Sequence, residues 1–184
     1  RREGVTTYAV DGTFDDCQRM VKEAFSREET RQRFTSANSI NVGRLLPQMT
    51  YYFWAARNHP EGQFRCCVPS GNLGNLTAGT LAHLSGLGST RFLAAHNANR
   101  FFPDFLKSGD ETYAPSVRTL SNAMDVGDPS NMERLFDLHE ERSELLRIAR
   151  AASFDDETIR RVIGSGPGSW GLRWNGGSRI RKGN

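Results

Sequence analysis

The apolar and turn-forming residues in the middle of the chain predict a strand, a tight turn and a helix in succession. Phe64–Val68 is a short apolar run, which is typical of an interior strand of a parallel sheet. Pro69–Gly71 interrupts this run with residues that favour turns. After Asn75, leucine and alanine recur at helical spacing as far as Leu84. The rest of the chain can be arranged around this unit.

A second buried strand is predicted at Thr90–His96 (TRFLAAH), directly after this helix. A strand, a helix of ordinary length and another strand form a right-handed crossover, so the two strands should be parallel. Ligands of such sheets bind at the carboxyl ends of the strands, which here carry Ser70–Asn75 and His96–Asn99. We expect His96 to be an ordinary loop histidine, and the asparagines after it either bind a ligand or cap the next helix.

Further elements are predicted on both sides of this unit. In chain order they are a β-rich segment at 5–10, a surface helix at 14–25 that covers a sheet, a helix at 42–56, an irregular polar loop at 116–131, a helix at 132–152 and a short helix at 155–163. Thr13 should cap the first of these helices, and Ser153 or Asp155 the last. A long structured loop inside a compact domain is more often functional than incidental. The pattern as a whole predicts an α/β domain.

The turn at Ser70–Asn75 has the composition of a phosphate-binding loop. Gly71 and Gly74 allow a sharp turn and a close approach of the backbone to a ligand. Asn72 and Asn75 can cap the helix and donate amide hydrogens. The free N–H groups of the first helical turn favour a phosphate. On the pattern alone, a phosphate cradle and a plain capped turn are equally good interpretations.

Two other polar clusters precede this loop. Five of the seven residues of Thr35–Asn41 (TSANSIN) carry hydroxyl or amide groups, which favours helix capping over a polar pocket. Arg44 follows one turn into the next helix, where its guanidinium either holds a substrate phosphate or is simply solvated. Asp15 and Asp16 open the helix at 14–25 and are more typical of helix-dipole residues than of catalytic carboxylates.

Composition fits a single globular domain of 184 residues with 37% hydrophobic residues. No apolar run approaches the roughly 20 residues that span a membrane, and the N-terminal residues have no signal-peptide pattern. Because the sequence starts without methionine, we expect it to begin in mid-protein. Two of its three cysteines are adjacent, at Cys66 and Cys67, which suits core thiols in a reducing cytoplasm better than disulfides or a metal site.

The net charge of +3 arises from the C-terminal end of the chain. Residues 1–158 hold 18 of the 24 lysines and arginines but all 21 acidic residues. Trp170, Arg173 and Trp174 form a basic and aromatic pattern that keeps nucleic-acid binding as a minor alternative. From Gly164 onward the sequence has seven of its 18 glycines and no apolar period. A reading-frame slip in a GC-rich gene explains this end better than a disordered basic tail does.

Four stretches of the chain resemble the threonine synthases of bacteria and fungi, in the same order. They are TTYAVDGTFDDCQRMVKEAF, SANSINVGRLLPQMTYYF, VPSGNLGNLTAG and TLSNAMDVGDPSNMERL. The resemblance extends over Val5–Val162. It implies a truncated α/β, three-layer parallel-sheet domain of a fold-type-II pyridoxal-phosphate enzyme, with the fold of tryptophan synthase β. The implied parts are the end of a smaller domain at 1–36, most of a larger phosphate-binding domain at 37–163, and a non-homologous or disordered tail at 164–184.

The resemblance also implies a chemistry. It points to a cytoplasmic pyridoxal-phosphate-dependent lyase that converts O-phospho-L-homoserine and water to L-threonine and phosphate. The residues implied to hold the cofactor phosphate are Gly71, Asn72, Leu73, Gly74 and Asn75, with Leu73 in place of the family's usual aromatic residue. The residues implied to lie beside the active-site cleft, as candidate substrate contacts, are Asn38, Ser39, Asn41 and Arg44.

The lysine that forms the Schiff base in this family has no counterpart in the chain. It belongs to a phenylalanine–lysine–aspartate word, whereas this chain has only Lys22, Lys107 and Lys182, none in that context. We therefore assign no catalytic residue and expect the chain alone to be inactive. Two alternatives stay open: another fold-type-II enzyme, such as a threonine dehydratase or a cysteine synthase, and a non-enzymatic truncated product that binds phosphate or nucleic acid weakly.

Overall fold

The computed structural model describes residues 4–58, 64–88 and 90–165. The strands are β1 (Phe64–Pro69), β2 (Thr90–His96) and β3 (Ala149–Ser153). The helices are α1 (Phe14–Ser26), α2 (Glu28–Arg33), α3 (Leu45–Arg57), α4 (Gly74–Ala82), α5 (Phe101–Ser108), α6 (Met132–Leu138), α7 (Arg142–Ile148) and α8 (Asp156–Ser165). Short helical turns occupy Val42–Arg44, His83–Leu87 and Asn122–Met124. The helices predicted at 14–25, 42–56 and 155–163 are therefore present.

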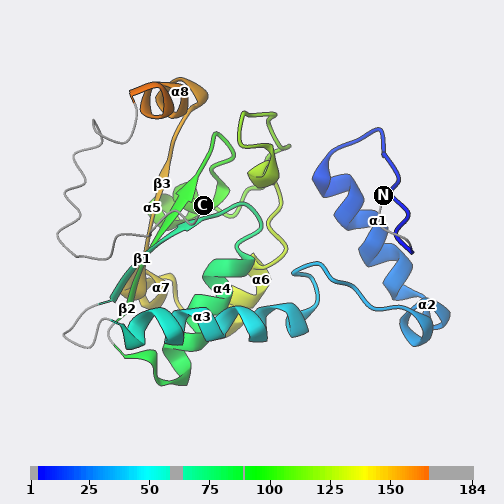
Figure 1. Cartoon of the computed structure of the whole chain (residues 1–184), viewed down its shortest axis with the longest axis horizontal. Coiled ribbons are helices and arrows are strands. Elements are labelled where there is room, and N and C mark those ends of the chain that lie inside the picture. Colours follow the sequence, from blue (N-terminus) through cyan, green and yellow to red (C-terminus); the bar gives the residue numbers. More distant parts are fainter. Residues whose placement is uncertain (1–3, 59–63, 89, 166–184) are drawn as a thin grey trace, which may run out of the picture.

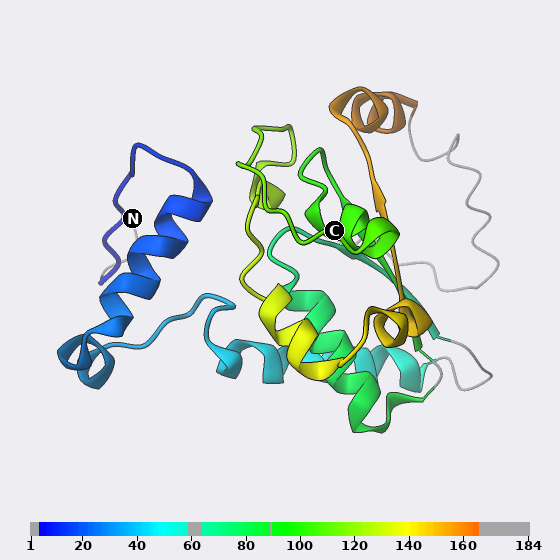
Figure 2. The same ribbon diagram turned by 180° about the vertical axis from the view of Figure 1, so that it is seen from behind.

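The strands form a parallel sheet in the order β1-β2-β3, which confirms the predicted α/β fold. Right-handed crossovers between successive strands place the connecting helices on one face of the sheet. Figures 1 and 2 show α3, α4 and α6 together on that side. Leu76 of α4, Phe92 of β2 and Phe102 of α5 are buried in the core beneath them.

The opposite face of the sheet is exposed in the described part of the chain. In β1 Val68 is buried while Cys67 is exposed, and Leu93 of β2 is 40% exposed. The exposed face also carries three arginines, one from each strand: Arg65, Arg91 and Arg150. The expectation that β1 is an interior strand is therefore wrong for the sheet of the described residues, because β1 lies at its edge with one face uncovered. Of the adjacent thiols only Cys66 is partly buried, and this burial raises the pKa of its thiol to about 11.

Two predictions of local structure are wrong. The single helix expected over 132–152 is divided into α6, α7 and the strand β3. The alanine-rich sequence of β3 favours a helix, but pairing with β2 and burial of Ala149 override that propensity. The β-rich segment Val5–Val10 forms no strand, because no described strand lies beside it to complete a hydrogen-bonded ladder.

Helices α1 and α2 lie beside the α/β body and not over its sheet, contrary to the predicted covering role (Figure 1). Thr13 caps α1 as expected, since its Oγ1 accepts from the backbone N–H of Asp16. The Asp16 carboxylate accepts from the N–H of Thr13 in return, and this bond lowers the pKa of Asp16. Asp155 likewise caps α8 by accepting from the N–H of Thr158 at 2.8 Å.

The predicted domain limits at 36 and 163 stay predictions. Residues 166–184 of the expected tail lie outside the described residues. None of the described helices has the length and apolar character needed to cross a bilayer.

Candidate functional site

The predicted strand–turn–helix unit is present at the carboxyl end of β1. The strand ends at Pro69 and α4 begins at Gly74, one residue before the predicted end of the turn. Leu73, between them, has a φ of +59°, which is the left-handed conformation. This conformation turns the chain sharply, so that the strand passes into the helix over a short loop.

The two glycines of this loop lie where a side chain would not fit. A Cβ added at Gly71 would lie 2.8 Å from the Cα of Met124 in the long loop 116–131. A Cβ added at Gly74 would lie 2.9 Å from the Cβ of Ser39. The loop Ser70–Asn75, called the glycine loop below, is therefore packed between two segments that are far away in the sequence, one with Ser39 and one with Met124.

Asn72 connects these segments and does not cap α4. Its Nδ2 donates to Oγ of Ser39 at 2.9 Å, and its Oδ1 accepts from the N–H and the hydroxyl of Ser130 at 2.7 and 3.0 Å. Its backbone oxygen accepts from Nδ2 of Asn131 at 2.9 Å. The predicted capping role is wrong because α4 has no side-chain cap and the amide of Asn72 is used elsewhere.

Asn75 is held by Tyr52 of α3 and also provides no cap. The Tyr52 hydroxyl donates toward Asn75, whose backbone oxygen and Oδ1 both lie 2.9 Å away. Tyr52 is 4% exposed, and its burial raises the pKa of the hydroxyl. The hydroxyl therefore stays protonated and available as a donor.

Replacing Tyr52 by phenylalanine should lower the free energy of unfolding by about 1 kcal/mol, because one buried hydrogen bond is lost. Urea denaturation of the 184-residue chain measures this difference. Tyr51→Phe is the matched control, since Tyr51 is 47% exposed. Equal stability of the two variants would show that the hydroxyl of Tyr52 does not stabilise the glycine loop.

A cavity of about 370 Å³ opens beside the glycine loop. Its walls are formed by Phe14, Ala37, Asn38, Ser39, Arg44, Gln48, Pro69, Gly71, Asn72, Leu73, Gly74, Asn75, Ala123 and Met124. The structure thus brings together all five residues of the predicted phosphate loop and three of the four candidate substrate contacts. Their roles in binding stay a prediction. Phe14 was not predicted, since an exposed helix start carries no local signal, whereas Ala123 and Met124 belong to the loop 116–131 that was expected to be functional.

Asn41, the fourth candidate substrate contact, does not line the cavity. Its Oδ1 accepts from the N–H of Gly43 at 3.0 Å, and its Nδ2 donates to the backbone oxygen of Ser36 at 3.0 Å. Asn41 therefore caps the helical turn at Val42–Arg44, as the capping interpretation of Thr35–Asn41 predicts.

A polar network holds the long loop at the end of β2. Asn97 is fully buried and donates to Oδ1 of Asp125 at 2.8 Å, and Asn99 donates to the same oxygen at 3.2 Å. Thr119 donates to the two oxygens of Asp125 from its hydroxyl at 2.7 Å and from its N–H at 3.0 Å. Val117 donates its N–H to Oδ1 of Asn99 at 2.6 Å. These asparagines therefore position the loop, and they contribute no group to the cavity.

His96 is a core residue and not the loop histidine expected from the sequence. It is the last residue of β2, is 4% exposed, and packs with its ring centroid 5.8 Å from that of Phe102. Its Nε2 has no hydrogen-bond partner in the described part of the chain. Burial lowers the pKa of His96 to about 4, although a hydrogen bond to the backbone of Asn99 acts in the opposite direction. The imidazole is therefore neutral near pH 7.

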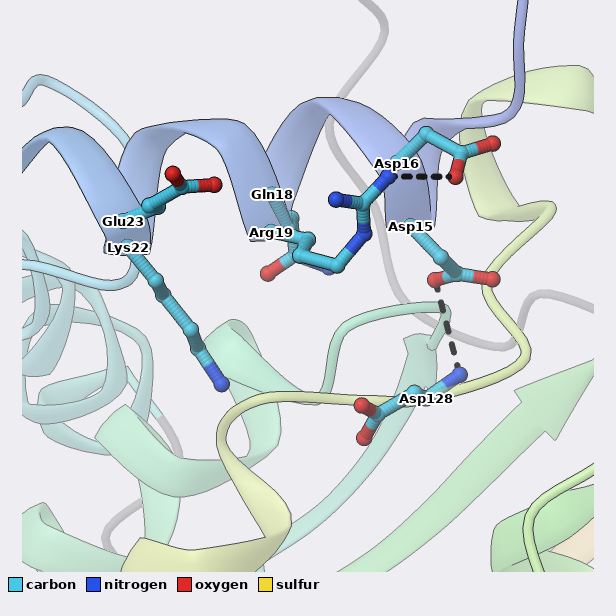
Figure 3. A pocket seen from close by; sticks show the side chains of 7 residues that line it. All are labelled: Asp15, Asp16, Gln18, Arg19, Lys22, Glu23 and Asp128. Atoms are coloured by element: carbon cyan, nitrogen blue, oxygen red, sulfur yellow. Dashed lines mark hydrogen bonds and ion pairs between the residues drawn. The ribbon is translucent and has the colours of Figure 1, made fainter.

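Of the residues that the structure describes, no lysine lines the cavity beside the glycine loop. Lys22 extends from α1 into a second cavity, of about 540 Å³, between α1 and Asp128 (Figure 3). Lys107 lies in the last turn of α5, and Lys182 is outside the described residues. Over residues 4–58, 64–88 and 90–165, no group of three or more His, Cys, Asp or Glu is placed to hold a metal ion.

Comparison of the sequence with known proteins identifies relatives that are named threonine synthase. No protein-family model matches the chain. It is 45% identical over 161 residues to threonine synthase of Serratia marcescens, which covers 85% of this chain and 38% of the relative. For threonine synthase of Escherichia coli the identity is 44% over 164 residues, with 86% and 38% covered. The chain thus spans about two fifths of the length of these relatives.

Solved structures agree with these relatives. Threonine synthase of Escherichia coli superposes with a TM-score of 0.74 at 43% identity, covering 83% of this chain and 37% of that one. A threonine synthase of Brucella melitensis with bound pyridoxal phosphate gives 0.72 at 29% identity, with 84% and 40% covered. Maize serine racemase, at 19% identity and a TM-score of 0.55, shares the fold.

Proposed function

This chain is a homologue of the threonine synthases, and from that premise we propose that it provides the cofactor-phosphate side of a pyridoxal-phosphate-dependent active site. The proposed reaction is the conversion of O-phospho-L-homoserine and water to L-threonine and phosphate, in the cytoplasm. One observation carries the proposal: all five residues of the predicted phosphate loop line one cavity at the carboxyl end of a parallel strand.

The residues of the loop fit a phosphate group. Gly71 and Gly74 have no side chains to cover the backbone, and the first turn of α4 has no side-chain cap. Its N–H groups are therefore free of an intrahelical or capping partner and lie at the positive end of the helix dipole. When pyridoxal phosphate is bound, it supplies an electron sink for carbanion chemistry.

Other residues that line the cavity can orient a substrate. Arg44 is one of them, and its guanidinium can bind a phosphate by two parallel hydrogen bonds. Ser39 is held in place, because its Oγ accepts from both Asn72 and Asn131 at 2.9 and 3.2 Å. Since no described lysine lines the cavity, we propose that this chain alone binds the cofactor reversibly and does not complete the reaction.

Gly71→Asp should weaken the binding of pyridoxal phosphate by roughly tenfold or more, because the carboxylate repels a phosphate over a few ångströms. The new Cβ would also collide with the backbone of Met124 at 2.8 Å. Absorbance titration of the chain with the cofactor, with inorganic phosphate as competitor, measures the affinity. Gly164→Asp is the matched control, because its Cβ would meet no atom within 4 Å. Equal affinities of the two variants would refute the assignment of the loop.

Borohydride reduction and an assay of phosphate release together test the expected absence of a Schiff-base lysine and of activity. In the presence of pyridoxal phosphate, we expect no stoichiometric labelling of a lysine and no phosphate release from O-phosphohomoserine. Specific labelling of Lys22 or Lys107, together with phosphate release that Gly71→Asp abolishes, would show that the chain forms a working site by itself.

A further inference from the structure

Asp15, in the first turn of α1, binds the backbone of the long loop. Its Oδ2 accepts from the N–H of Gly127 at 3.0 Å, and its Oδ1 lies 3.4 Å from the N–H of Asp128. Figure 3 shows the Asp15 carboxylate pointing from the helix toward Asp128. Bonds from backbone N–H groups to a carboxylate are charge-assisted, and they do not depend on the side chains of the loop.

The loop is packed tightly at this contact. A Cβ at Gly127 would lie 2.2 Å from the backbone oxygen of Ala114 and 3.1 Å from Oδ2 of Asp15. Glycine is therefore needed at this position mainly because the backbone of Ala114 lies so close, and the contact with the carboxylate is made within this tightly packed turn. Asp16, the next residue of α1, has a different role, because its carboxylate completes the capping box with Thr13.

The residues next to this contact line the cavity beside the glycine loop. Phe14 directly precedes Asp15, while Ala123 and Met124 lie a few residues before Gly127. The backbone of Met124 rests against Gly71, where an added Cβ would be only 2.8 Å away. Asp15 thus connects two parts of the cavity lining whose residues lie more than 100 positions apart in the sequence.

We propose that Asp15 is a positioning residue that keeps the segment 122–128 against the glycine loop, so that the cavity is shaped to hold a phosphate-bearing ligand. This assignment rests on the proposed function. It gives Asp15 a role beyond the helix-dipole interaction expected from the sequence. It also makes α1 a functional part of the site.

Amide hydrogen exchange of the 184-residue chain tests the contact itself. Exchange over 122–128 should be on the order of tenfold faster in Asp15→Asn, which keeps one acceptor oxygen without charge, and faster still in Asp15→Ala. Exchange in β2 should be unchanged. Glu23→Gln is the matched control, since it removes one negative charge from the same helix and from the cavity of Figure 3 without a bond to the loop.

Titration of the same variants with pyridoxal phosphate tests the link to the site. Asp15→Ala should raise the dissociation constant by roughly tenfold, because the fraction of molecules with the segment 122–128 held against the glycine loop falls by that factor. Glu23→Gln should leave the dissociation constant unchanged. If the unmodified chain binds no cofactor, the proposed function fails, and the exchange over 122–128 then decides the role of Asp15 by itself. Unchanged exchange in Asp15→Ala, or faster exchange with unchanged affinity, would overturn the proposal.

Discussion

Asp125→Ala should lower the free energy of unfolding by roughly 3 kcal/mol, because a carboxylate that accepts several hydrogen bonds disappears from a partly buried network. In the variant, Nδ2 of the fully buried Asn97 and the hydroxyl of Thr119 lose the carboxylate oxygen to which each donates, at 2.8 and 2.7 Å. The long loop should also separate from the end of β2. Urea denaturation measures the first effect, and amide exchange over 117–125 measures the second.

Asp128→Ala is the control for this change. Asp128 belongs to the same loop but is exposed, so its removal should change the stability by less than about 0.5 kcal/mol. If Asp125→Ala were as stable as Asp128→Ala, the network around Asn97 would not hold the loop, and the wall that carries Met124 would need another support.

Acidification should destabilise the chain through His96. The pKa of His96 is about 4 in the folded protein, against an ordinary value of 6.5, so the unfolded chain binds the proton more tightly. The free energy of unfolding should therefore fall as the pH decreases from 6.5 to 4, and should not depend on His96 above this window. The full effect of such a shift is about 3 kcal/mol.

The variant His96→Phe isolates this contribution, since phenylalanine is apolar and can pack against Phe102. Its stability, measured by urea denaturation between pH 4 and pH 7, should depend less steeply on pH than that of the unmodified chain. His139→Phe should retain the contribution of His96, although burial also lowers the pKa of His139. If the free energy of unfolding changed with pH equally in His96→Phe and in the unmodified chain, protonation of His96 would not destabilise the folded state.

The elements that the sequence predicts correctly are those with local signals. Thr90–His96 is an apolar run between turn residues, and Thr13 with Asp16 forms a capping pair within one helical turn. β3 could not be predicted, because Ala149–Ser153 has helix-forming composition and becomes a strand only by pairing with β2. The burial of one face of β1 and the exposure of the other depend in the same way on its neighbours.

The candidate site shows the same division. The glycine loop has a local composition that predicts a phosphate cradle or a plain turn, and the resemblance to the threonine synthases favours the cradle. The use of Asn72 could not be predicted, because its partners Ser39 and Ser130 lie 33 and 58 residues away. The contact between Asp15 and Gly127 spans 112 residues, so the sequence alone shows only an acid at a helix start.

The exposed face of the sheet has a consequence for colloidal behaviour. An uncovered edge strand such as β1 is a template on which a second chain can add, and stacked uncovered faces promote aggregation. Arg65 and Arg91 occupy paired positions on neighbouring strands, and Arg150 adds a third positive charge on β3. Like charges at paired positions weaken the sheet slightly, but they also repel the same face of another copy. This repulsion acts over about 8 Å at physiological ionic strength, so added salt removes the protection that the arginines give against self-association.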